Sequence, residues 1–230
     1  MEEKTYMELG ETPQIKEKAL EELKRLIRQE PRFEPLMDDI FLLAFLRHKK
    51  YDVKNAFKIL CNFYAMKKKY FRILTDFKPS ELNYVLEKNQ LTVQPFRCPD
   101  GCSIGIWRIG HHNFETTTLE DLTATLMTMG LMLIRIEASQ VCGLVMIWDW
   151  KSLSFQEFNK ISLHRAAHYA YDILVFVHRS DLTELHKHVP PELLPEELGG
   201  TLGPLNNQDY MEYFLNQEDY IEQINNSGIK

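Results

Sequence analysis

The spacing of the apolar residues changes near Leu91, and this change constrains the fold more than any other feature of the sequence. From Pro13 to about residue 72, apolar residues recur every three or four positions, which is the period of an amphipathic helix. Beyond Leu91, short alternating runs typical of strands are separated by helical stretches. The pattern predicts a helical N-terminal part followed by an α/β part.

The N-terminal part contains three predicted helices. Thr12 followed by Pro13 is a good helix start, and Asp52 can cap the third helix. The second helix, "DIFLLAFLRHKK", can be capped by Asp38 or Asp39, and it is apolar nearly all round, which indicates burial. We therefore expect a bundle of three helices over residues 12 to 72, with "PSELNYVLEKN" as a shorter helix that leads out of it.

The α/β part begins with a predicted hairpin. The strands "LTVQPF" and "SIGIWRI" are joined by "RCPDGC", which carries turn residues. A long helix then begins at Thr118 and ends near "ASQVCG", and "LVMIWDW" is a strand that is apolar on both faces. This order predicts a mixed, partly parallel sheet flanked by helices. The expected division is a bundle (1–75), an α/β domain (76–205) and an acidic C-terminal tail (206–230).

The charge of the chain restricts its partners. The formal net charge of −6 argues against nucleic-acid binding as the main task, because phosphate neutralisation favours a basic domain. No apolar run reaches the roughly 20 residues that span a bilayer, and the first residues are not those of a signal peptide. We expect a cytoplasmic monomer. The basic run Lys67, Lys68, Lys69 and Arg72 is either a local interaction surface or a solvated helix end.

The sequence gives no support for an enzyme, a metal site or a cofactor. Cys98 and Cys102 lack two further zinc ligands at familiar spacing. His164 and His168 lie four apart, but Arg165 stands where a zinc protease holds its general-base Glu. Phosphate-binding, dinucleotide-binding and nucleophile-elbow motifs are absent from the sequence, and "GGTLG" follows a helix, so its glycines more readily end that helix than bind a phosphate.

The long helix carries more apolar residues than one buried face requires. Met127, Met129, Leu131, Met132, Leu133 and Ile134 give it more than one apolar face. Either this helix is sandwiched between the sheet and the bundle, or one face lines a cavity for an apolar ligand.

Four segments occur in an order that resembles the CRAL-TRIO family, in particular its cellular-retinaldehyde-binding and alpha-tocopherol-transfer members. They are "DDIFLLAFLRHKKYDVKNAFKIL", "DGCSIGIWRIGHHNF", "CGLVMIWDWKSLSF" and "SDLTELHKHVPPELLPEELGG". The resemblance runs from Pro13 to about Tyr220. It implies a helical N-terminal bundle and an α/β domain that encloses one hydrophobic molecule, such as a retinoid, a tocopherol or a phospholipid. The implied function is transfer of that molecule between membranes by a non-enzymatic protein peripheral to them.

The resemblance also implies site residues. The matching pocket positions are Ile104, Ile106, Leu126, Met129, Gly130, Leu133, Val145, Ile147, Phe155 and Phe158. At Gly130, relatives can place a small polar side chain. Arg47, with Lys49 and Lys50 beside it, matches a basic position that helps to hold a phosphoinositide headgroup. The alternative is that Arg47 is a surface arginine at a helix C-terminus.

One stretch departs from the family pattern. In "AAHYAYDILVFVHRSDL", residues 166–182, a helical pattern meets a strand pattern without turn residues. In the family, a central strand and a mobile gate helix precede the last strand, and both are missing here, with the seam at residues 171–175. Either Ile173 to Val177 fill the vacancy or the sheet has a gap. The competing function is therefore a scaffold or regulatory variant that has lost the closed lipid cavity.

Overall fold

The computed structural model describes residues 9–111, 113, 115–153 and 182–230. Its N-terminal part is helical, as predicted, and the helices begin at the predicted caps. The Thr12 hydroxyl accepts a hydrogen bond from the amide of Ile15, and Asp38 and Asp52 accept equivalent bonds one turn into their helices. The helices are α2 (Pro13–Arg28), α3 (Asp39–His48) and α4 (Val53–Lys69).

Helix α3 is the centre of this part of the core. Five of its apolar side chains are buried, which confirms the prediction from its all-round apolar character. Phe41 and Phe45 meet edge to face with ring centroids 5.1 Å apart, and Phe41 also contacts the rings of Phe63 and Tyr64 on α4. These edge-to-face contacts fix the packing of α3 on α4.

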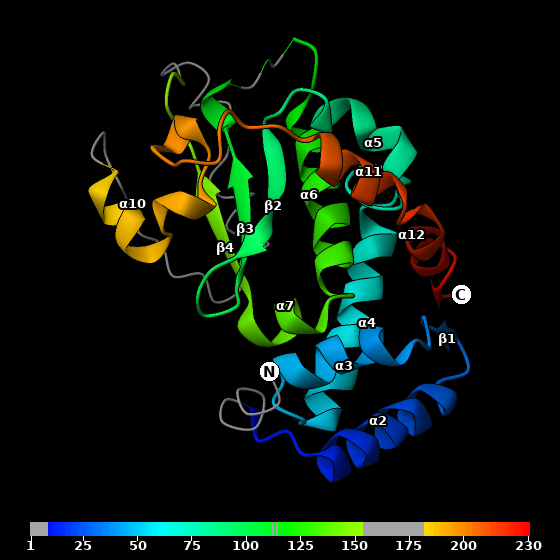
Figure 1. Cartoon of the computed structure of the whole chain (residues 1–230). Coiled ribbons are helices and arrows are strands. Elements are labelled where there is room, and N and C mark those ends of the chain that lie inside the picture. The colour runs from blue at the N-terminus through cyan, green and yellow to red at the C-terminus, as the bar shows by residue number, and fades with distance from the viewer. Residues whose placement is uncertain (1–8, 112, 114, 154–181) are drawn as a thin grey trace.

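The C-terminal residues are folded against the N-terminal part. Residues 206–230, which the sequence presented only as an acidic tail, form α11 (Gln208–Leu215), α12 (Glu218–Asn225) and β5 (Gly228–Ile229). Strand β5 pairs antiparallel with β1 (Phe33–Glu34). Buried Phe214, Ile221 and Ile224 explain the difference, because apolar residues at helical spacing lie between the acidic ones. Both helices pack against α5 (Pro79–Leu86), and the C-terminus lies near β1 (Figure 1).

The described sheet has the order β2–β3–β4. Strands β2 (Leu91–Arg97) and β3 (Ser103–Trp107) form the predicted antiparallel hairpin, and β3 pairs parallel with β4 (Leu144–Trp148). Gly101 turns the hairpin at φ +88°, where a Cβ would also lie 2.8 Å from the Cys142 sulfur. A mixed, partly parallel sheet was predicted, and the described strands have this arrangement.

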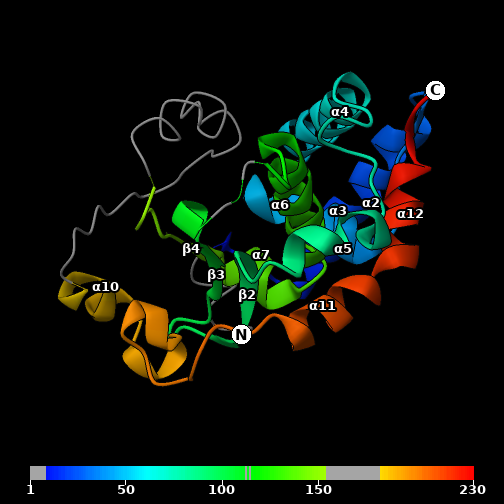
Figure 2. The same ribbon diagram turned by 90° about the horizontal axis from the view of Figure 1, so that it is seen from above.

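The predicted long helix is two helices. Thr118 caps α6 (Leu119–Leu133) in a capping box with Asp121, and α7 (Glu137–Cys142) follows after a short break. The segment 182–205 contains α10 (Thr183–His188) and the 3₁₀ turns Pro191–Leu193 and Glu196–Leu198. Gly199, at φ +71°, ends the last turn, as expected for "GGTLG". Figures 1 and 2 show α6 and α10 on opposite faces of the sheet.

Two kinds of feature are absent from the part of the chain that the structure describes. None of its helices is both long and apolar enough to cross a membrane. The described His, Cys, Asp and Glu side chains form no group of three that is placed to hold a metal ion. His164 and His168 lie outside the described residues.

Candidate functional site

The predicted pocket residues of the sheet lie on the face that is turned away from α6. Ile104, Ile106 and Ile147 are buried, and Val145 packs beside them. Their cluster is completed by apolar side chains of the 182–205 segment, namely Leu182, Leu185, Val189, Leu193, Leu194, Leu198 and Leu205. The four sheet residues, Ile104, Ile106, Val145 and Ile147, therefore anchor the "LPEELGG" segment to the sheet.

The intervening residues of the same strands belong to the cluster that contains α6. Trp107, Met146 and Trp148 pack in one cluster with Leu126 and Met129. Because successive side chains of a strand point to opposite faces, Ile104 and Ile106 do not line the same cavity as α6. The prediction that joined both sets in one pocket is at odds with this geometry, and Figure 2 shows α6 and α10 on opposite faces of the sheet.

Helix α6 presents a half-buried apolar stripe. Leu126, Gly130 and Leu133 are spaced four and three apart, so they share one helix face, and all three are partly exposed. Met129, by contrast, is buried in the core at 2% exposure. Among the described residues, a Cβ added at Gly130 would meet no atom within 4 Å. The stripe therefore has open space at its centre and apolar side chains on both sides of that space.

The side of the sheet that packs in one cluster with Leu126 and Met129 is built from bulky, adaptable side chains. Gly105 leaves room for Met146 to lie across strand β3, since a Cβ there would be 2.8 Å from the Met146 methyl carbon. Trp107 and Trp148 meet edge to face at 5.2 Å, and Trp150 lies 6.0 Å from Trp148. The Trp107 indole nitrogen is buried and has no hydrogen-bond partner among the described residues. We call this set the α6 face: Leu126, Met129, Gly130, Leu133, Gly105, Trp107, Met146 and Trp148.

Four residues of the α6 face, Leu126, Met129, Gly130 and Leu133, are predicted pocket positions, and its four sheet residues are not. Both faces of β3 and β4 are apolar, so the alternation of polar and apolar residues that normally identifies the pocket side is absent. The one sequence signal for the correct face was the "PPELLPEELGG" segment, because its leucines also had to pack against one face of the sheet.

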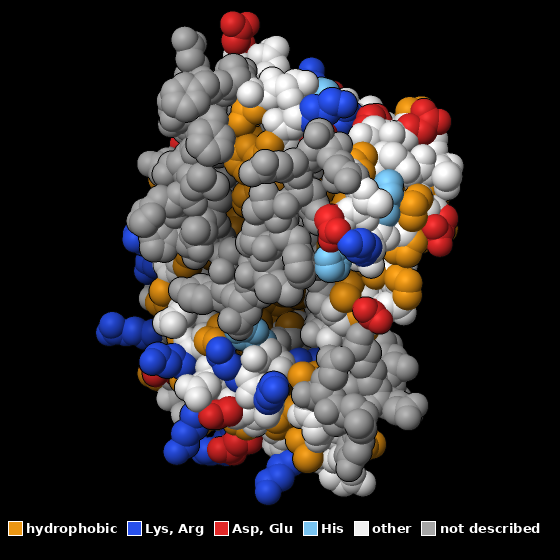
Figure 3. Space-filling view, turned by 90° about the vertical axis from the view of Figure 1, so that its left-hand side faces the viewer, with side chains coloured by type: hydrophobic (Ala, Val, Ile, Leu, Met, Phe, Trp, Pro, Cys, Tyr) orange, Lys and Arg blue, Asp and Glu red, His pale blue; other side chains and the backbone are white. Residues whose placement is uncertain are grey.

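The space-filling view shows hydrophobic side chains in a vertical strip in the upper half of the side that carries β4 and α10 (Figure 3).

Some predicted positions are outside the described residues. Phe155 and Phe158 fall in residues 154–181, as does the proposed seam at 171–175. Ile173 to Val177, which were expected to fill the vacancy in the sheet, lie there too.

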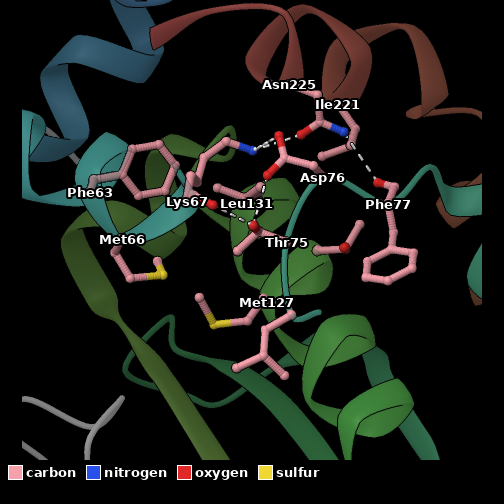
Figure 4. A pocket seen from close by; sticks show the side chains of 12 residues that line it. Phe63, Met66, Lys67, Thr75, Asp76, Phe77, Met127, Leu131, Ile221 and Asn225 are labelled. Atoms are coloured by element: carbon pink, nitrogen blue, oxygen red, sulfur yellow. Dashed lines mark hydrogen bonds and ion pairs between the residues drawn. The ribbon is translucent and has the colours of Figure 1, made fainter. Parts of the chain in front are cut away.

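A small cavity lies between α4, α6 and α12, and it is lined by both apolar and polar groups. Buried Lys67 is 2.9 Å from the carboxylate of Asp76 and 2.8 Å from the side-chain oxygen of Asn225 (Figure 4). Burial holds the pKa of Lys67 below its usual value, although the hydrogen bond with Asp76 acts in the opposite direction. The cavity has a volume of about 20 Å³, enough for roughly one water molecule. It is too small for a retinoid or a tocopherol.

Arg47 is buried, with only 4% of its surface exposed. Its guanidinium forms a bidentate ion pair with Glu11 at 2.8 and 2.9 Å, and it also donates to Glu137 at 3.1 Å and to Gln140 at 2.6 Å. Burial alone would lower the pKa of Arg47, but the hydrogen bonds and charge of Glu11 raise it above its usual range. Arg47 therefore joins the start of α2, the end of α3 and α7.

This geometry does not fit the two sequence-based interpretations of Arg47. A headgroup contact requires an accessible guanidinium, and so does a solvated arginine at a helix end. Neither interpretation includes the carboxylates of Glu11 and Glu137, which lie 36 and 90 residues away in sequence. Lys49 is half-buried and Lys50 is exposed, so these two lysines are the accessible members of the predicted headgroup set.

The sequence is similar to curated proteins over most of its length. It is 28% identical to human alpha-tocopherol transfer protein-like over 263 positions, which cover 96% of this chain and 76% of that protein. It is 24% identical to mouse clavesin-1 over 242 positions (88% and 68%) and 24% identical to human clavesin-2 over 266 positions (94% and 78%). No family model matches the chain.

The alignments contain stretches of the relatives that have no counterpart in this chain. With alpha-tocopherol transfer protein-like, the 263 aligned positions cover about 221 residues, which is 96% of 230, so about 42 positions face gaps in this chain. The same arithmetic gives about 40 such positions for clavesin-1 and about 50 for clavesin-2. These relatives are members of the CRAL-TRIO family, and together with the ordered motifs they show that the chain is related to that family.

Proposed function

We propose that this protein binds one hydrophobic molecule on the α6 face and transfers it between membranes without catalysing a reaction. The observation that carries the proposal is the open space at Gly130, which lies within an apolar stripe and where an added Cβ would meet no described atom within 4 Å. Exposed apolar surface of this kind is costly in water, at about 25 cal/mol per Å², and a bound apolar molecule removes that cost. The name of the relative alpha-tocopherol transfer protein-like supports a hydrophobic ligand.

The α6 face includes a buried polar group that could orient a ligand. The buried Trp107 indole N–H has no partner among the described residues, and a ligand hydroxyl or carbonyl would accept its hydrogen bond. Ligand sites are mostly apolar with a few placed polar groups, which suits a retinoid, a tocopherol or a phospholipid. The absence of a side chain at Gly130 leaves room for a bulky part of such a ligand.

A second candidate function is a scaffold or regulatory protein that no longer closes around a lipid. One observation favours it: about 40 to 50 aligned positions of the relatives face gaps in this chain, as expected if a central strand and the gate helix are missing. Saturable ligand binding distinguishes the two functions.

The test is a binding titration with all-trans-retinol and with α-tocopherol, followed by tryptophan fluorescence. Trp107 and Trp148 lie in the α6 face, so a ligand there should quench the emission in a saturable way. Gly130→Leu should fill the open space and weaken binding on the order of tenfold or more. The control is Ile106→Val, a mild change on the opposite face, which should leave affinity unchanged. If both variants bind like the wild type, the ligand does not occupy the α6 face.

We also propose that phosphoinositide lipids promote release at the membrane through Lys49 and Lys50. Arg47 is left out because its ion pairs bury it. Replacing both lysines with alanine should weaken binding to phosphoinositide-containing vesicles, with a larger effect at low salt, because exposed charges are screened. Unchanged binding would assign the two lysines to solvation.

A further inference from the structure

Positive charge is concentrated in one segment of an acidic protein. Residues 53–78 contain seven lysine and arginine residues and one aspartate, which gives a local net charge of +6 in a chain of −6. The remaining residues therefore carry about −12. Such an asymmetry predicts attraction of this segment toward a negatively charged surface.

The turn after α4 exposes the most accessible large apolar side chains of the described residues. Phe71 is 61% exposed and Ile73 is 53% exposed, whereas the next most exposed large apolar residue, Phe96, is 49% exposed. Both lie between the end of α4 at Lys69 and the start of α5 at Pro79. An aromatic and an aliphatic side chain therefore project from the same turn as the basic residues.

Buried hydrogen bonds and an ion pair hold the base of the turn after α4 in place. The Thr75 hydroxyl donates to the backbone oxygen of Lys67 at 2.9 Å, and the buried Lys67–Asp76 ion pair connects the two sides of the turn. Asn225 of α12 accepts from Lys67 and donates to the backbone oxygen of Phe77 (Figure 4). Since its base is fixed by buried polar contacts, the turn holds Phe71 and Ile73 outward without the entropy cost of ordering a loose loop.

Two of the cations beside Phe71 are not neutralised by carboxylates. Arg72 pairs with Glu81 at 2.7 Å, and Lys78 pairs with Glu222. Lys68 and Lys69 are exposed, and neither forms an ion pair with a described carboxylate. The Lys69 ammonium lies 5.1 Å from the centre of the Tyr70 ring. Lys68 and Lys69 are thus the charges available to an external anion.

We propose that the turn of residues 68–73 docks this protein on an anionic lipid bilayer, with Phe71 and Ile73 entering the interface and Lys68 and Lys69 contacting the headgroups. Apolar side chains that project between lysines match the layered polarity of a bilayer surface. A protein partner would need a pocket for each projecting side chain, whereas a bilayer needs none. The inference is independent of the ligand proposed for the α6 face, because it concerns a different surface and requires no bound molecule.

The test is co-sedimentation with vesicles of phosphatidylcholine alone and with vesicles that contain about 20% phosphatidylserine. The wild type should bind the anionic vesicles more tightly, and salt should weaken this binding. Each lysine near the surface contributes about 1 kcal/mol, about a fivefold change in affinity, so replacing Lys68 and Lys69 together with Gln should weaken binding roughly 25-fold. Phe71→Ala combined with Ile73→Ala should weaken it on the order of tenfold.

Matched control variants distinguish binding through the turn of residues 68–73 from nonspecific electrostatic or hydrophobic adsorption to the vesicles. Lys18→Gln changes an exposed lysine on α2, and Phe96→Ala removes an exposed aromatic ring on β2, so both should leave vesicle binding unchanged. A wild-type protein that does not sediment with anionic vesicles overturns the proposal. So does binding that survives both turn variants. Ligand titration of the same variants reports separately on the α6 face.

Discussion

The buried Arg47 cluster predicts a large effect of a single substitution on stability. Arg47→Met keeps the length of the side chain but removes the partner of Glu11, whose side chain is only 10% exposed. Removing one member of a buried ion pair typically costs about 3–5 kcal/mol, because the remaining charge stays buried without compensation. Urea denaturation followed by circular dichroism should show this loss at unchanged m-value. Lys49→Met, two residues away and not in the cluster, should change stability by less than about 0.5 kcal/mol.

The same cluster predicts a pH dependence. Burial alone would raise the pKa of Glu11, but the hydrogen bonds from Arg47 and Tyr51 and the charges of Arg47 and Lys16 together more than offset it, so the pKa lies below the usual 4.5. A carboxylate with a lowered folded-state pKa adds stability above its unfolded pKa and loses it as the pH falls through the folded value. The difference between wild type and Arg47→Met should therefore be full at pH 6 and shrink below about pH 4. A difference below 1 kcal/mol at pH 6, or one that does not shrink in acid, would refute this reasoning.

Three further changes test other parts of the structure by urea denaturation. Asn207→Leu should lower the free energy of unfolding by about 2–4 kcal/mol, because the buried amide donates at 2.8 Å to the carbonyls of both Leu86 and Leu91. Tyr64→Phe should lower it by about 1–2 kcal/mol, since the lost hydroxyl accepts from the amide of Leu36 at 2.9 Å. Gly130→Ala should raise it by about 0.5–1 kcal/mol, because alanine favours the helix and its Cβ meets open space. Losses near zero at Asn207, or destabilisation at Gly130, would contradict the packing described for those sites.

Local features of the fold could be predicted because local residues determine them. A hydroxyl or carboxylate one turn before an apolar stripe satisfies the free amides of the first turn, so Thr12, Asp38 and Asp52 indicated where the helices begin. The hairpin could also be predicted from local residues, because Gly101 supplies the positive φ that its turn requires.

Distant contacts could not be predicted in the same way. The side of β3 and β4 that faces α6 depends on what covers each face, and both faces are apolar, so the sequence alone does not distinguish the face of Ile104 from the face of Trp107. The burial of Arg47 depends on Glu11 and Glu137, which lie far away in sequence. A single basic residue in a helix end looks the same in sequence whether it is solvated or paired.

The most direct measurement of the central claim is native mass spectrometry of the protein purified from its own source. We predict a mass shift that corresponds to one hydrophobic molecule per chain, retained by Ile106→Val and lost or strongly reduced in Gly130→Leu. A wild-type protein without copurified lipid, which also shows no saturable binding of retinol or tocopherol, would contradict ligand binding on the α6 face and favour the scaffold function.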